Sequence, residues 1–137
     1  IYADTIRNRI KELNLEDRVK LTGKISELDK AYYLKNCYAF CFPSLREGFG
    51  IPPIEAMSYG KPVFLSNKSS LPEVGGKHAF YWNNFKPDYM ADILVNGMKE
   101  FNSKKEAFEI NLINHANSYS WNETAKAYLE VYHSLLE

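Results

Sequence analysis

Apolar and polar positions along the first part of the chain change from helical spacing to strand spacing and back. Apolar residues recur at helical spacing over residues 2–14, which predicts a first helix. A turn follows, and residues 19–22 are predicted to form a short strand. The Ser-x-x-acid pattern from Ser26 to Asp29 is typical of a helix start, so a second helix is predicted to run to about Asn36.

The middle of the chain continues this alternation with more strongly apolar segments. Residues 38–42 are nearly all apolar, which predicts a parallel strand buried on both faces. A glycine-bearing loop leads to a helix from about Pro52 to Gly60, since proline fits the first turn of a helix and glycine its end. Residues 62–66 are predicted to form the next strand, and residues 79–82 a short edge strand.

From Pro87 onward every segment has helical spacing, and Ser120 to Glu123 repeat the pattern of a helix start. The aromatic row of the last helix, which includes Trp121 and Tyr128, is expected to be mainly core. Helices and strands that alternate in this order indicate βαβ units. We therefore expect an α/β fold, an open parallel sheet with helices on both faces and a helical C-terminus. Ligands of such sheets bind beyond the carboxyl ends of the strands.

The composition narrows the class of protein. The chain has 137 residues, enough to bury a core in a single ordinary domain, and 45% of them are hydrophobic, which is typical of a globular chain. Its 17 basic and 17 acidic side chains give zero net charge, which argues against nucleic acid as a partner. Two cysteines cannot build a disulfide scaffold, and the apolar runs are too short to span a bilayer. No secretory leader is recognised, and because the first residue is Ile rather than Met we expect a piece of a longer protein.

The segment around the glycine-bearing loop carries the densest chemistry. It leaves a predicted strand and enters a helix start, where unpaired N–H groups and the helix dipole favour negative charge. Gly48 and Gly50 allow the backbone to approach a ligand. The amides from Gly48 to Ile51 would supply most of the donors, because the following prolines supply none. Glu47 and Glu55 suit the hydroxyls of a sugar or a ribose better than a phosphate.

Both glutamates also have ordinary explanations. Glu55 could simply complement the helix dipole, and Glu47 could be a solvated loop residue. Two glutamates at one chosen spacing therefore give little support for a function by themselves.

The same segment resembles the E-x7-E signature of retaining GT-B glycosyltransferases of family 4, the group 1 family. Glu47 and Glu55 have this spacing, and the runs Glu-Gly-Phe-Gly, Glu-Ala-Met and Gly-Lys-Pro-Val around them also match. Residues 17–23 resemble the family's upstream strand and glycine, residues 70–75 its downstream stretch, and residues 120–121 the start of its closing helix. The resemblance covers nearly the whole chain from about residue 17.

The resemblance implies a Rossmann-like C-terminal domain that binds a nucleotide-diphospho-sugar donor. Glu55 would hold the ribose hydroxyls. Glu47 would lie at the donor sugar as the catalytic residue, in the limited sense of an electrostatic and positioning group. The backbone amides expected at the sugar and diphosphate are those of Gly48, Phe49, Gly50 and Ile51. The residues expected to line the base are Gly23, Lys24 and Ile25.

The resemblance also implies the course of the reaction. Transfer would retain the anomeric configuration, by a front-face attack in which the leaving diphosphate accepts the acceptor's proton. No metal or other cofactor is expected, because the chain lacks the Asp-x-Asp pattern of metal-dependent GT-A enzymes. Cys37 and Cys41 have a spacing that could suit zinc, but no histidine lies near them in the sequence. Buried, reduced thiols are expected instead.

Two parts of the family pattern are expected outside this chain. A basic Arg and Lys pair that neutralises the diphosphate would precede residue 1, and the acceptor-binding N-terminal domain is absent. We therefore expect a single, incomplete C-terminal domain that is inactive by itself and whose closing helix packs partly toward the missing domain. We also expect a cytoplasmic enzyme of bacterial surface-polysaccharide synthesis, with membrane contact only through the absent parts.

Two other functions stay open at this stage. Another GT-B enzyme, such as a sugar-nucleotide epimerase or a phosphorylase, would share the fold, although the run from Glu-Gly-Phe-Gly to Glu-Ala-Met disfavours it. A non-catalytic nucleotide- or carbohydrate-binding module would share the binding groups. The motif does not fix the nucleotide, the sugar or the acceptor.

Overall fold

The computed structural model describes residues 2–136, which divide into two compact units with the boundary after Lys30. The first unit contains helix α1 (Tyr2–Glu12) and the beginning of helix α2 (Glu27–Asn36), which crosses the boundary. The first helix was predicted from the spacing of apolar residues and the second from its Ser-x-x-acid start, and both are confirmed.

Helix α2 begins at the predicted cap. The Asp29 backbone N–H donates to Ser26 Oγ at 3.1 Å, and the Ser26 N–H donates to Asp29 Oδ2 at 3.4 Å. These reciprocal bonds satisfy donors that the first turn of a helix leaves unpaired, so the sequence determines this helix start locally.

The strand predicted over residues 19–22 is not formed. Val19 is 40% exposed and Leu21 is 45% exposed. A strand exists only through hydrogen bonds to a neighbouring strand, and the described residues of the first unit contain no other strand. The prediction from local pattern is therefore wrong for this structure.

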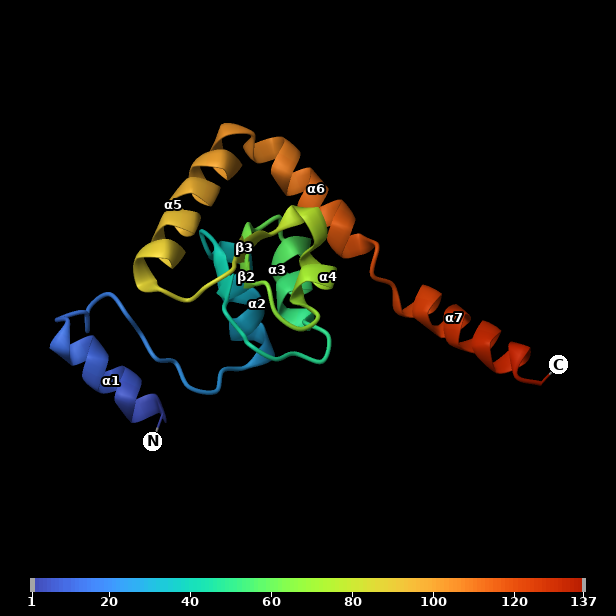
Figure 1. Ribbon diagram of the computed structural model, residues 1–137, viewed down its shortest axis with the longest axis horizontal. Coiled ribbons are helices and arrows are strands. Elements are labelled where there is room, and N and C mark those ends of the chain that lie inside the picture. Colours follow the sequence, from blue (N-terminus) through green and yellow to red (C-terminus); the bar gives the residue numbers. More distant parts are fainter. Residues whose placement is uncertain (1, 137) are drawn as a thin grey trace. The chain divides into compact units, whose positions relative to one another are not determined.

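The second unit is built around a three-stranded parallel sheet (Figure 1). Strand β2 (Val63–Ser66) lies between β1 (Phe40–Phe42) and β3 (Phe80–Trp82). Strand β2 lies within residues 62–66, where a strand was predicted, and every one of its residues is buried, as is usual for a central parallel strand. Strand β3 lies at an edge, also as predicted. The α/β fold class is confirmed.

The two faces of the sheet are covered by different helices. Register places Cys41, Phe64 and Phe80 side by side on one face, which is covered by α5 (Pro87–Ser103). Phe42, Leu65 and Tyr81 share the opposite face, beneath α3 (Ile51–Ser58) and α4 (Leu71–Gly75). This alternation follows from the two-residue period of a strand.

Glycines allow these helices to lie very close to the strands. A Cβ added at Gly97 of α5 would lie 2.7 Å from a Phe64 ring carbon, and one at Gly75 of α4 would lie 2.8 Å from Leu65 Cδ1. Such distances are too short for carbon atoms, so both contacts require the absence of a side chain. After α4, the short 3₁₀ helix η1 (Gly76–His78) leads into β3.

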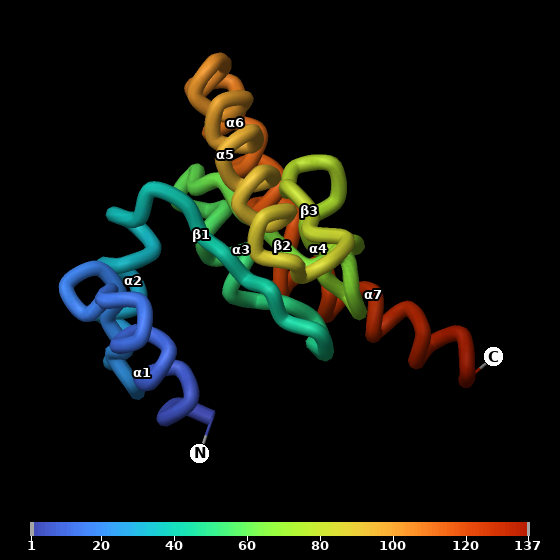
Figure 2. Tube along the Cα trace, turned by 60° about the vertical axis from the view of Figure 1, so that its left-hand side comes forward, coloured from blue at the N-terminus to red at the C-terminus, as the bar shows by residue number. Residues whose placement is uncertain are grey.

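Helix α6 (Lys105–Asn117) follows α5 after a corner at Lys104 and packs on α3 (Figures 1 and 2). The core combines residues of the strands with the inner faces of these helices. Its largest fully buried side chains are Phe64, Met57, Leu65, Leu71, Leu112, Val63 and Val74.

Helix α7 (Trp121–Ser134) is exposed along its whole length, and none of its residues is buried. Its start is as predicted, since Ser120 Oγ accepts the Glu123 N–H at 3.5 Å. Its aromatic row is not core: Trp121 is 83% exposed, and Tyr128 is exposed as well. The expectation of a core row is therefore wrong. No helix among residues 2–136 has the length and apolar character needed to cross a bilayer.

Strand β1 also departs from the prediction of burial on both faces. Phe40 and Phe42 are half-buried and stack at 5.8 Å between ring centroids, but Cys41 between them is exposed. The strand lies at the edge of the sheet, where α5 covers it incompletely. The expected buried thiol is correspondingly wrong for Cys41, whereas Cys37 is half-buried.

Candidate functional site

Two loops leave the carboxyl ends of neighbouring strands, the edge where open α/β sheets bind ligands. Residues 43–50 connect β1 to α3, and residues 67–70 connect β2 to α4. The buried Ser66 at the end of β2 donates its hydroxyl to the Ser44 carbonyl, so the loops are joined at their roots. We name these two segments together the carboxyl-edge loops.

Gly50 determines how the first loop enters α3. It is the N-cap residue, with φ of +113°, and a Cβ there would lie 3.1 Å from Leu71 Cδ2. Both observations favour glycine. No side chain caps α3, and Pro52 and Pro53 contribute no N–H to its first turn. The backbone donors at this positive end of the helix dipole therefore come from Gly48 to Ile51, as the sequence predicts.

Glu47 and Glu55 lie on either side of this helix start, and both are half-buried. Glu47 belongs to the loop, immediately before the glycines. Glu55 is the fifth residue of α3, so it lies just past the first turn, where the sequence had placed it. Side chains on an α-helix lean toward its N-terminus, a tendency that favours the expected direction of the Glu55 carboxylate toward the carboxyl edge.

The residues expected to line a nucleotide base belong to the other unit. Gly23, with φ of +65°, and Lys24 are exposed, and Ile25 is half-buried just before α2. Their grouping with Glu47 and Glu55 stays a prediction.

Sequence reasoning missed two serines that hold the first loop. Ser69 Oγ donates to the Glu47 carbonyl at 2.6 Å and accepts the Glu47 N–H at 3.2 Å. Ser70 Oγ donates to the Phe49 carbonyl at 2.6 Å. The available signal was a polar stretch directly after a buried strand, but its partners lie more than twenty residues away in the chain.

Aromatic contacts support the loop from another side. The Phe49 ring meets Tyr119 edge-on, at 5.8 Å between centroids. Tyr119 donates its hydroxyl to the Val74 carbonyl at 3.3 Å, and burial together with Glu73 raises the pKa of Tyr119. This phenol therefore stays neutral near pH 7 and acts as a hydrogen-bond donor to α4.

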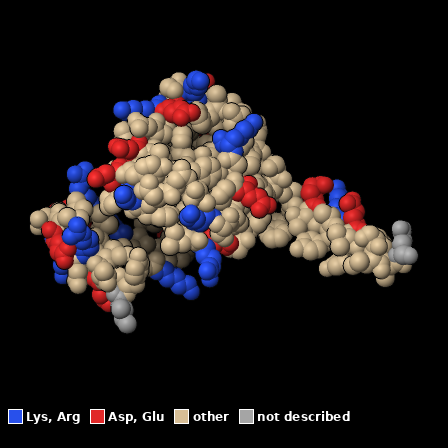
Figure 3. All heavy atoms as spheres, in the orientation of Figure 1, with Lys and Arg blue, Asp and Glu red and all other residues tan. Residues whose placement is uncertain are grey.

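Charges of both signs are interspersed over the face of the molecule shown in Figure 3. In the carboxyl-edge loops, Arg46 and Lys68 are exposed cations. Among residues 2–136, no three His, Cys, Asp or Glu side chains gather as metal ligands. The expectation of a metal-free site stays a prediction.

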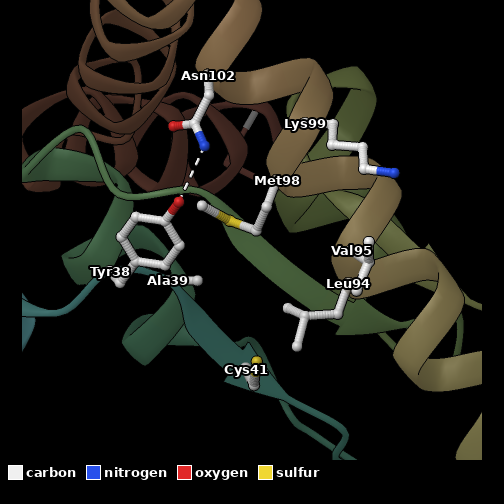
Figure 4. Close-up of a pocket in the computed structure, with 8 residues that line it drawn as sticks. All are labelled: Tyr38, Ala39, Cys41, Leu94, Val95, Met98, Lys99 and Asn102. Carbon is white, nitrogen blue, oxygen red and sulfur yellow. Dashed lines mark hydrogen bonds between the residues drawn. The ribbon is translucent and has the colours of Figure 1, made fainter.

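A separate hollow of about 560 Å³ lies between β1 and α5 (Figure 4). Its lining is mainly apolar, with Leu94 and Met98 from α5 facing Cys41, while Asn102 donates to the Tyr38 hydroxyl at 2.9 Å. Tyr38 precedes β1, so the hollow extends toward the amino end of the strand, away from the carboxyl-edge loops.

Comparison with known proteins identifies the family. Residues 2–119 match the family model described as glycosyl transferases group 1. The chain belongs to the group 1 glycosyltransferases. Two curated relatives of this group 1 chain are serotype-specific mannosyltransferase WbdA of Escherichia coli, 38% identical over 122 residues, and O-antigen chain mannosyltransferase RfbU of Salmonella typhimurium, 37% identical over 82 residues. These alignments cover 85% and 60% of this chain, and 14% and 23% of the relatives.

The group 1 chain thus spans less than a quarter of either relative. Its fold is similar to that of sucrose-phosphate synthase from Thermosynechococcus elongatus, with a TM-score of 0.75 and 24% identity, over 96% of this chain and 33% of that one. This likeness confirms the expected Rossmann-like α/β fold, with a parallel sheet flanked by helices.

Proposed function

We propose that this chain is the donor-binding part of a retaining glycosyltransferase that transfers mannose from a nucleoside diphosphate to a saccharide acceptor. Membership of the group 1 family supports glycosyl transfer. The choice of mannose rests on the names of the relatives, several of which are mannosyltransferases. Two of them, including RfbU, are named for the O-antigen chain, which favours a role in bacterial surface-polysaccharide synthesis.

One structural observation carries the donor site. The uncapped N-terminus of α3 lies at the carboxyl edge of the sheet with Glu47 before it and Glu55 within it. In the proposed complex, Glu55 accepts from the ribose hydroxyls and Glu47 accepts from the donor sugar. The amides from Gly48 to Ile51 donate to the sugar and diphosphate, where the helix dipole favours negative charge.

The remaining features of the proposal come from the family resemblance. Gly23, Lys24 and Ile25 contact the base, and no metal takes part. The leaving diphosphate accepts the acceptor's proton, so Glu47 stabilises and positions rather than acting as a base. The reaction takes place in the cytoplasm, where nucleotide sugars are made.

Ligand-observed NMR with UDP, GDP and ADP tests the donor site on this chain. We expect one nucleotide to bind, and Glu55→Gln to weaken it at least tenfold, since hydrogen bonds to a charged group contribute about 1.5–3 kcal/mol each. Glu100→Gln is the matched control: Glu100 is exposed on α5 and should leave binding unchanged. Equal loss of binding in both variants would contradict the assignment of Glu55.

Transfer is tested with the product of the complete gene. Incubation with nucleoside diphosphate mannose and an oligomannoside acceptor should give an α-linked product, visible in the anomeric region of the proton spectrum. Nucleotide binding without turnover would instead support a binding module. Conversion of the donor sugar without an acceptor would support an epimerase.

A further inference from the structure

The backbone of Ser69 adopts an unusual conformation within the carboxyl-edge loops. Its φ is +56°, in the left-handed region that residues other than glycine and asparagine rarely adopt. Among residues 2–136, Asn14 is the other non-glycine residue with positive φ, and asparagine tolerates it well. Glycine would fit the Ser69 backbone with less strain, so the hydroxyl must account for a serine in this place.

That hydroxyl binds both backbone polar groups of Glu47. It donates to the carbonyl at 2.6 Å and accepts the N–H at 3.2 Å. Two bonds to one residue fix the direction of its Cα–Cβ bond, from which the Glu47 carboxylate extends. Ser70 continues the contact by donating to the Phe49 carbonyl at 2.6 Å.

The loop needs such external support because of its own composition. A Cβ at Gly48 would meet nothing within 4 Å, so no packing restrains the backbone there. Phe49 is itself exposed, and Gly50 has φ of +113°. Two glycines in three residues leave many backbone conformations open, which a hydrogen-bonded neighbour can reduce to one.

We infer that Ser69 and Ser70 are positioning residues that hold Glu47 and the following amides in the geometry that receives the donor. This inference rests on the proposed function for the identity of the ligand, but the order of the loop is independent of it. The strained backbone of Ser69 is retained because its hydroxyl fixes Glu47.

Ser69→Gly removes the hydroxyl but allows the backbone to keep its positive φ. Glycine adopts a positive φ without the strain of about 1–2 kcal/mol that serine carries there, which offsets the loss of both bonds to Glu47, so the thermal midpoint should change little. In native-state hydrogen exchange, we expect the Glu47 amide, which donates to Ser69 Oγ, to exchange about five- to thirty-fold faster, the factor given by one to two lost hydrogen bonds. Ser103→Gly is the control, since its hydroxyl donates within α5 to Glu100.

Kinetics of the complete gene product supply the second readout. Ser69→Gly should lower kcat/KM for the donor about five- to thirty-fold without lowering the thermal midpoint, which a merely structural residue would not do. Unchanged exchange at the Glu47 amide would overturn the inference. If exchange accelerates while donor binding and turnover match the wild type, the serines order the loop without serving the donor, and the inference also fails. If the wild-type protein binds no nucleotide, the proposed function is refuted. The hydrogen-exchange result does not depend on that outcome, so the two failures can be told apart.

Discussion

Gly97→Ala should destabilise the protein even though alanine is the better helix former. Gly97 lies within α5 and is buried against the sheet. Replacing a helical glycine by alanine gains about 1 kcal/mol of helix propensity. The added Cβ, however, would lie 2.7 Å from a Phe64 ring carbon and 2.9 Å from two ring carbons of Phe80. Carbon atoms pack at about 3.5–4.0 Å, so the rings must move by roughly 1 Å.

These rings have little freedom to move. Phe64 is fully buried and stacks with Phe80 at 4.9 Å between centroids, while Trp82 lies 6.0 Å away on the same face. Overpacking of this kind costs about 1–3 kcal/mol, and three contacts under 3 Å place it at the upper end. With the propensity gain subtracted, we expect the free energy of unfolding to fall by about 2 kcal/mol.

Urea denaturation followed by circular dichroism measures this change. Asn96→Ala is the matched control, because Asn96 is the exposed neighbour in the same helix and gains propensity without a clash. In a Phe80→Leu background, Gly97→Ala should cost about 1 kcal/mol less, since contacting residues are not additive. A Gly97→Ala protein as stable as the Asn96→Ala protein would refute the argument that close approach of α5 requires glycine.

Two further predictions concern titratable groups beside α4. Tyr81 donates its hydroxyl to the Gly76 carbonyl at 2.8 Å, so Tyr81→Phe should lower the free energy of unfolding by about 1 kcal/mol. Burial and Tyr119 raise the pKa of Tyr81 to about 12, so the stability from this phenol should persist at neutral pH and be lost as pH rises from 10 through 12. Absorbance titration of wild type and Tyr81→Phe checks this, and a phenol that titrates normally would contradict it. Burial, His115 and Lys77 lower the pKa of His78 below 6.5, so the unfolded chain binds more protons just below that pH. The thermal midpoint should therefore fall as pH drops below about 6.5, less steeply in His78→Gln. Parallel slopes in the two proteins would exclude His78 as the cause.

Features determined by nearby residues were predictable from the sequence. The caps at Ser26 and Ser120 follow from side chains three positions away. Strand β2 lies within the short apolar run that begins at Pro62, which was predicted to form a strand. The E-x7-E spacing likewise identified the loop and helix start at the carboxyl edge, because its residues lie within one short segment.

Features determined by distant residues were not predictable. Whether residues 19–22 form a strand depends on a partner strand, and whether Cys41 is buried depends on how far α5 extends over the sheet edge. The exposed row of α7 has the helical spacing of a core face but has no element packed on it in the described part of the chain. Ser69 was missed for the same reason, since nothing near it in the sequence indicates its bonds to Glu47.

The parallel order of β1, β2 and β3 has a consequence for the folding route. Each strand pairs with the next one along the chain, so the sheet can grow through short loop closures. The contact between α3 and α6 is different, because it brings Gly60 against Glu109 across all the intervening elements. We expect the sheet with α3 and α4 to form the folding nucleus, and α6 to dock after the transition state. Changes on the α6 face would then act mainly on the unfolding rate, and so on the lifetime of the folded unit rather than on how fast it forms.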